Sequence, residues 1–441
     1  MMPANGAGFL GGARDRLLPV SVPFRYFLAA SLFHVAAWAV LLAGAADLTG
    51  FAGGPGLILA AVHLTTLGVL AMSAMGAAFQ LLPVVTRRAM GAPWPAAAAF
   101  WVFAPGVALL TWGMGRAATG LMLAGSALSI AGLAIFALLT LRNLARAGAV
   151  AVVAGHGWAA LAALAVLAGL GATLVADFAG GFLPDRAVLA GLHAVLGIFG
   201  FMGLLVAGFS LVLIPMFALS RSLPTAPGWA GLAAGVSGVG FAAAAALSGM
   251  PALWWPALGA GLLAAGIHLA LMQLSERRAM RRRLGLPFAL LRAARWALVA
   301  TLMLAGAGWL GAPVPNAPVL IGFLLIAGWL LTFLMGVLSR ILPFLASMHA
   351  SGRTGLPLLM SDLTCEPCLR LHAGAHFAGL AAVATGIVAD QTPLIRLGAT
   401  LGLAGALGFA AFAFNVALQL WKFRHAKPAQ RGKPAQKGRP T

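Results

Sequence analysis

The sequence predicts an all-α polytopic membrane protein of about twelve transmembrane helices, arranged as three pseudo-symmetric four-helix units. Of its 441 residues, 62% are hydrophobic and only 8% are charged, whereas about 25% of residues are charged in soluble domains. Runs of about 20 apolar residues recur from end to end. One motif also recurs at roughly 130-residue spacing, which indicates a structural unit used three times.

Gly- and Pro-rich turns, such as Gly53-Gly-Pro55 and Ser248-Gly-Met-Pro251, separate the apolar runs. They form a single predicted transmembrane domain over 1–421, followed by a basic tail at 422–441. We predict that this tail is disordered and contacts anionic lipid head groups. The predicted spans are 26–46, 57–84, 95–114, 117–140, 157–177, 187–219, 228–248, 252–273, 289–310, 318–347, 371–389 and 395–421, and the repeats cover 26–140, 157–273 and 289–421.

Basic residues alternate between successive loops, which predicts the orientation of the chain. The formal net charge is +20, and arginines concentrate in every second loop and in the tail. By the positive-inside rule both termini are expected in the cytoplasm. The Ala-, Gly- and Arg-rich composition favours a bacterial inner membrane. The basic residues lack the interleaved aromatics that a nucleic-acid surface would need, so nucleic acid is not an expected partner.

The repeated motif is a glycine followed seven residues later by a proline after two aliphatic residues. It occurs at Gly76–Pro83, Gly208–Pro215 and Gly336–Pro343. Each copy ends the second helix of a four-helix unit, and we expect these three helices to form the inner wall of a pseudo-threefold ring. Their prolines are expected to mark the cytoplasmic face, and their small residues allow close backbone approach.

Three histidines in apolar runs are candidate cofactor ligands. His63 and His193 begin two of the inner-wall helices, both roughly 9 Å deep from the outer side, so they are expected to face each other at one level. His34 lies nearer the middle of the first span. Neutral imidazole is a good ligand for haem iron or copper. The alternative is that each histidine is satisfied by a backbone carbonyl, water or helix packing.

A second candidate is a cytoplasmic metal cluster. His372 and His376 are four residues apart on one helix face, a spacing that can chelate one metal ion. The Cys-x-x-Cys pair lies just before them and His349 precedes it. We expect the cysteines to be reduced because the cytoplasm is reducing. Metal binding, a redox pair and local packing all remain open; the cluster is Cys365, Cys368, His372, His376 and His349.

The stretch from His63 to Pro83, with Met75-Gly-Ala-Ala78 and Leu81-Leu-Pro83, resembles the second helix of the haem–copper oxidase large subunit, closest to the nitric oxide reductase branch. The chain is also similar in style to NnrS-type haem- and copper-containing membrane proteins. The resemblance implies haem b and copper as cofactors. It implies that His63 binds haem, that His193 binds the active-site metal, and that respiratory or denitrification proteins are partners.

The sequence departs from that family where the reducing centre would be. The predicted seventh and tenth helices, 228–248 and 318–347, contain no histidine. We therefore expect a divergent relative that lacks the complete reducing centre and that serves electron transfer, sensing, or the support of respiratory or denitrification enzymes; whether any catalysis remains is left open. Two other hypotheses stand beside this one: a permease for a metal or small solute, and an accessory subunit without a ligand.

Overall fold

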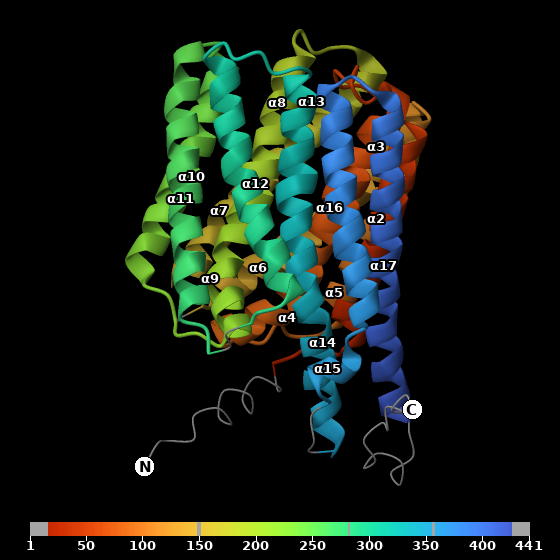
Figure 1. Cartoon of the computed structure of the whole chain (residues 1–441), viewed down its shortest axis with the longest axis vertical. Coiled ribbons are helices and arrows are strands. Elements are labelled where there is room, and N and C mark those ends of the chain that lie inside the picture. Colours follow the sequence, from red (N-terminus) through yellow and green to blue (C-terminus); the bar gives the residue numbers. More distant parts are fainter. Residues whose placement is uncertain (1–15, 148–150, 281–282, 355–357, 426–441) are drawn as a thin grey trace.

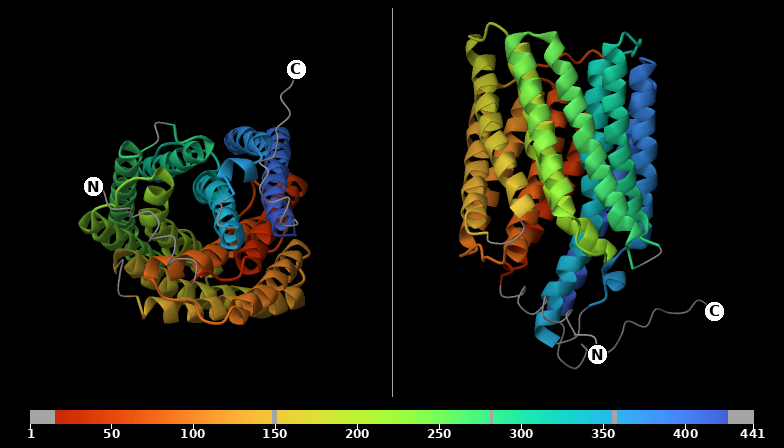
Figure 2. Two further views of the ribbon diagram at one scale, coloured as in Figure 1. Left: turned by 90° about the horizontal axis from the view of Figure 1, so that it is seen from below. Right: turned by 90° about the vertical axis from the view of Figure 1, so that its left-hand side faces the viewer.

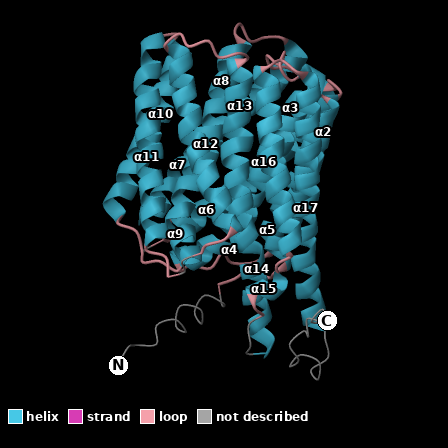
Figure 3. Cartoon of the chain, in the orientation of Figure 1, coloured by secondary structure: helices cyan, strands magenta, loops and turns pink. Residues whose placement is uncertain are grey.

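A computed structural model describes residues 16–147, 151–280, 283–354 and 358–425. Twelve of its helices are long and apolar enough to span a membrane, and the described residues form no strand (Figure 3). The multi-pass all-α fold predicted from composition is therefore confirmed. In a bilayer only such structures, or closed barrels, satisfy every backbone polar group.

The spans group into three successive units of four (Figure 1). The first unit has α2 (Ser21–Ala43), α3–η2–α4 (Leu57–His63, Leu64–Ala71, Met72–Thr86), α5 (Trp94–Gly115) and α6 (Thr119–Leu144). The second has α7 (Ala151–Gly180), α8–η3–α9 (Arg186–Val195, Leu196–Gly203, Leu204–Ala218), α10 (Thr225–Ser248) and α11 (Trp254–Arg277). The third has α12 (Leu286–Trp309), α13–η5–α14 (Ala317–Phe323, Leu324–Leu331, Thr332–Thr354), α16 (Glu366–Val388) and α17 (Thr392–His425). Short helices connect them: η1 (Ala45–Asp47), η4 (Pro251–Leu253) and α15 (Met360–Leu363).

The three units close into a ring. The last helix of each unit packs against the first helix of the next, through α6 and α7, α11 and α12, and α17 and α2. Seen from below, the chain winds once around the molecule, from red through green to blue and back to red (Figure 2). The second helix of each unit is its inner wall. In the most apolar stretch of each inner-wall span, 61% of the residues are buried, against 22–50% in the other nine spans. The inner-wall spans are Leu57–Thr86, Arg186–Ala218 and Ala317–Ala350.

Each inner-wall helix contains an eight-residue π-helical segment at the same distance from its proline. These segments are η2, η3 and η5, and η5 contacts both of the others. A π-helical turn widens the helix locally and is frequent at functional sites. Its recurrence at one register confirms that the glycine–proline motif marks a repeated structural unit.

Each inner-wall helix continues past its proline, as the predicted spans 187–219 and 318–347 already required. Helix α4 continues past Pro83 to Thr86, and α14 continues past Pro343 to Thr354, beyond the body of the bundle (Figure 1). Each proline replaces only one backbone donor, so the turn that follows it can still form. In the last span, α17 continues to His425, so the first residues of the predicted tail are helical. The remaining tail, 426–441, lies outside the described residues.

Helices α4 and α9 instead end on residues with left-handed backbone conformation, Arg87 (φ 57°) and Leu219 (φ 53°). A non-glycine residue there costs roughly 1–2 kcal/mol.

We predict that Leu219→Gly raises the free energy of unfolding by about 1 kcal/mol, because the side chain is half exposed and little packing is lost. Thermal unfolding in detergent tests this. The control Leu263→Gly, at an exposed site inside α11, should instead lower stability by about 1 kcal/mol. Equal losses in both variants would contradict the prediction.

Candidate functional site

His63 and His193 lie face to face across the boundary between the first two units. His63 is the last residue of α3, immediately before η2, and His193 lies in α8 shortly before η3. Their ring centroids are 6.3 Å apart and the ring planes differ by 26°. Both side chains are half-buried. The expectation that these two imidazoles face each other at one level of the ring is confirmed.

The hydrogen bond of His63 fixes which of its ring nitrogens can bind a ligand. His63 Nδ1 lies 3.0 Å from the carbonyl oxygen of Leu59, one turn earlier. Because a carbonyl only accepts, Nδ1 carries the proton and Nε2 carries the lone pair. A metal-ligating histidine is commonly held this way through its other ring nitrogen. On the partner ring, Nδ1 of His193 is buried and makes no hydrogen bond of ordinary geometry within the described chain, although the backbone of Leu167 interacts with the ring.

A glycine in α7 provides the space for the His193 ring. A side chain at Gly171 would place its Cβ 3.1 Å from the Cε1 atom of His193, so any larger residue would displace the imidazole. The ring is thus positioned between α8 and α7. The sequence contains no local signal for this contact, because Gly171 and His193 belong to different helices.

A second histidine group lies where the third unit meets the first. His34 in α2 and His372 in α16 have ring centroids 6.0 Å apart, and His372 and His376 are 5.4 Å apart. All three side chains are at most 1% exposed. The structure therefore places His34 with His372 and His376, and not with His63 and His193 as the sequence suggested.

The tautomers of this group follow from its hydrogen bonds. The indole N–H of Trp38 donates to His34 Nε2 at 3.1 Å, so His34 carries its proton on Nδ1. His372 Nδ1 donates to the carbonyl of Gly405 at 3.0 Å, so its Nε2 is an acceptor. Both remaining atoms, His34 Nδ1 and His372 Nε2, are buried without a hydrogen-bond partner among the described residues. One is a donor and the other an acceptor, which suits a small polar guest such as water better than a metal ion.

His376 is held by the inner wall of the third unit. Its Nε2 lies 2.8 Å from the hydroxyl of Thr332, the residue that follows η5, and that hydroxyl donates to the carbonyl of Ala327 at 2.9 Å. The hydroxyl hydrogen is thereby used, so His376 donates and its Nδ1 keeps the lone pair. Sequence reasoning missed Thr332 and Trp38. The spacing of Trp38, four residues after His34, was a usable signal, whereas Thr332 had none.

The predicted cytoplasmic metal cluster is not assembled. His372 and His376 are buried inside the bundle, while His349 lies far along α14, where its Nε2 is 3.2 Å from the side-chain nitrogen of Gln80. The helix from Thr332 to His349 spans roughly 25 Å, which separates His349 from His376. Within the described ranges no three His, Cys, Asp or Glu residues are placed to hold one metal ion.

The two cysteines form a disulfide, so the expectation that they are reduced is corrected. Cys365 caps the N-terminus of α16 and Cys368 lies in its first turn, with Cα atoms 5.4 Å apart. That separation is within the ordinary range for a disulfide. A sequence cannot decide the redox state of such a pair, because the state depends on the local backbone and on the compartment.

The disulfide predicts a specific pattern of thiol labelling. The chain contains only two cysteines, so the purified protein should not react with maleimide until it is reduced, and should then react at two sites. Cys365→Ser is the control, because it leaves Cys368 unpaired and reactive without reduction. Mass spectrometry counts the adducts. Two adducts on the unreduced wild-type protein would contradict the assignment.

No protein-family model matches the chain, and no curated protein matches it. The two histidine groups, their positions in the ring and their hydrogen bonds are therefore the basis for any functional conclusion.

Proposed function

We propose that this chain is an integral membrane protein that binds a metal-centred cofactor, haem b or copper, between His63 and His193. In this proposal it serves electron transfer or the support of respiratory or denitrification enzymes, and it lacks a complete reducing centre of its own. The observation that carries the proposal is the facing pair of imidazoles, contributed by two inner-wall helices of different units.

The separation of the two rings supports shared coordination. Imidazole nitrogens bind such metals at about 2.0 Å, so two rings that share one ion have centres roughly 6 Å apart. The observed centroid separation is 6.3 Å. His63 and His193 would be the residues that hold haem iron or copper at this place. When bound, either group supplies one-electron redox chemistry.

The surroundings of the pair support binding over ordinary packing. Leu64, which follows His63 in η2, and Leu192 and Leu196, which flank His193, are buried apolar residues. A histidine that is only packed in such a shell usually satisfies both nitrogens, since a buried polar atom without a partner costs free energy. On His63 the Nε2 lone pair is left for a ligand, because Nδ1 donates to the carbonyl of Leu59.

A role without catalysis is favoured by the distribution of histidines. The seventh span, α10, contains none, and the tenth, from α13 to α14, contains only His349. That residue lies beyond the inner ring beside Gln80. The several histidine ligands around a haem–metal pair, which the resembled family uses, are therefore not available from these helices.

The location that we propose is a bacterial inner membrane, with both termini in the cytoplasm. Because the described residues form twelve candidate spans, α2 begins and α17 ends on the same face. Arginines gather at this face, including Arg87, Arg221 and Arg277, as the positive-inside rule requires of a cytoplasmic side. The bilayer and its anionic lipids are the expected partners of this face.

Pigment and metal analysis of the detergent-purified protein tests the proposal. We expect either a Soret band with a pyridine haemochrome of b type, or close to one copper ion per chain by elemental analysis. The protein should be expressed with haem precursor and copper both supplied, so that neither is limiting. A preparation that is monodisperse, colourless and free of stoichiometric metal under these conditions would overturn the proposal.

A further inference from the structure

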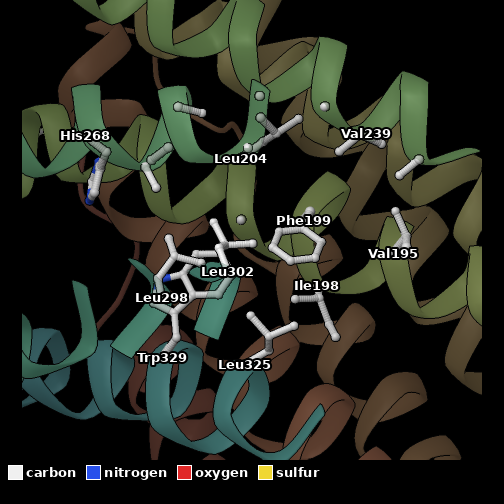
Figure 4. A pocket seen from close by; sticks show the side chains of 18 of the residues that line it. Val195, Ile198, Phe199, Leu204, Val239, His268, Leu298, Leu302, Leu325 and Trp329 are labelled. Carbon is white, nitrogen blue, oxygen red and sulfur yellow. The ribbon is translucent and has the colours of Figure 1, made fainter. Parts of the chain in front are cut away.

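A partly open cavity of about 510 Å³ lies between the second and third units (Figure 4). Most of its lining comes from η3, α9, α10, α11, α12 and η5, and residues of α7, α8 and α13 complete the walls. Along α11 the lining extends from Trp254 to Leu271, which corresponds to roughly 25 Å of helix. The cavity therefore follows most of the hydrocarbon thickness of a bilayer, about 30 Å. It contains neither His63 nor His193, so it is separate from the proposed cofactor site.

Small residues make up much of one wall of the cavity. Helix α10 lines it with four glycines, Gly228, Gly231, Gly235 and Gly238. The remaining lining is predominantly aliphatic and aromatic, and the rings of Phe199 and Trp329 lie nearly parallel, 5.9 Å apart, in its middle. A long, narrow, apolar space of this kind fits a flexible hydrocarbon chain.

The two histidines that line the cavity lie at one end of it. His156 and His268 line the end toward the arginine-rich face, and Figure 4 shows His268 apart from the other labelled side chains. The Nε2 atom of His268 is buried without a hydrogen-bond partner among the described residues. At the opposite end the indole rings of Trp254 and Trp309 are in edge-to-face contact. The ligand should therefore have a polar head at the arginine-rich end and an apolar tail along the remaining length.

Arg295 gives the polar end its charge. It lies one turn from the lining residue Leu298 and is only 3% exposed. Its terminal nitrogen Nη2 binds Glu276, whereas its Nε and its other terminal nitrogen have no partner within the described part of the chain. Glu276 also pairs with Arg292, so this carboxylate neutralises only one of two guanidinium groups. More arginines lie nearby in sequence at the same face, including Arg277 and Arg283.

We propose that this cavity binds one acyl chain of an anionic phospholipid, whose phosphate lies at the end marked by Arg295 and His268. Basic pockets between transmembrane helices on the cytoplasmic side are suited to such head groups. The excess positive charge favours a phosphate over the neutral head of an isoprenoid quinone, which could fill the same apolar space. The inference does not depend on whether a cofactor occupies His63 and His193.

Native mass spectrometry of the full-length protein tests this proposal. After delipidation, the protein is exchanged into mixed micelles with phosphatidylglycerol or phosphatidylcholine at equal concentration. We expect one phosphatidylglycerol to remain per chain under activation that removes phosphatidylcholine. Equal retention of the two lipids would overturn the proposal, as would retention of a neutral quinone from the native membrane in place of a phospholipid.

Two matched pairs of variants locate the site. Gly261 lines the cavity and a Cβ there meets no atom within 4 Å, so Gly261→Phe should fill the space and abolish retention. Gly259→Phe, on the lipid-exposed face of the same helix, should retain the lipid.

Arg295→Gln should reduce the preference for phosphatidylglycerol over phosphatidylcholine about fivefold. Arg292→Gln, which removes the exposed partner of the same carboxylate, should not. Unchanged retention in Gly261→Phe would exclude this cavity as the binding site.

Discussion

Alanine at His63, and separately at His193, is expected to lower the haem or copper content of the purified protein by at least about tenfold. Loss of a residue that only orients a metal ligand already costs roughly 10–100-fold in affinity, so loss of a direct ligand should cost no less. Each change also leaves the opposite imidazole alone in an apolar shell. Absorption spectra and elemental analysis, normalised to protein, measure the effect.

Controls separate ligation from damage to the fold. His372→Ala removes a buried histidine of the second group and should leave the cofactor content unchanged, because His372 belongs to the other interface of the ring. His425→Ala changes an exposed histidine at the end of α17 and should have no effect. All variants are compared by size-exclusion chromatography. Full cofactor content in a well-folded His63→Ala, His193→Ala double variant would contradict the assignment of the site.

Valine at Gly125 is expected to prevent stable folding of the first unit. A Cβ at this position in α6 would overlap the backbone nitrogen and Cα atoms of Leu110 in α5. Backbone atoms cannot move aside without separating the two helices, and close approach of small residues is what drives helix association in a membrane. Overpacking that side chains can absorb costs typically about 1–3 kcal/mol, so here the loss should exceed about 3 kcal/mol.

The same helix supplies the control for this prediction. Gly120 lies in the first turn of α6, and a Cβ at this position would meet no atom within 4 Å. Gly120→Val therefore adds the same side chain without a clash. Yield of monodisperse protein and thermal unfolding in detergent compare the two variants. If Gly125→Val were as stable as Gly120→Val, the tight α5–α6 contact would be wrong.

The sequence was sufficient to predict the spans because bilayer insertion depends on local hydropathy. The predicted segment 228–248, for example, corresponds to α10, Thr225–Ser248. The glycine–proline motif also identified the inner-wall helices, since a repeated unit places the same pattern at the same place in the ring. Helix ends were predicted less well. Helix α14, for example, is described as far as Thr354, seven residues beyond the predicted end at 347.

The sequence predicted one of the two histidine groups and missed the other. His63 and His193 were correctly placed together because both begin inner-wall helices, which share one level by repetition. His34 and His372 are more than three hundred residues apart in sequence and meet only because the third unit packs against the first. Sequence proximity instead suggested grouping His372 with Cys368. The π-helical segments had no local signal either, since Leu64–Ala71 and Leu324–Leu331 share little beyond their apolar character.

Closure of the ring by α17 against α2 has a consequence for biosynthesis. Chains emerge from the ribosome N-terminus first, so His34 enters the membrane long before the segment that carries His372 and Gly405 has been translated. Until then this wall of the first unit faces lipid or an insertion chaperone. The pair formed by His63 and His193 needs only the first two units and can assemble earlier. Ribosome-stalled intermediates truncated after residue 280 should therefore already hold the first histidine group together, whereas the second forms only on release of the complete chain.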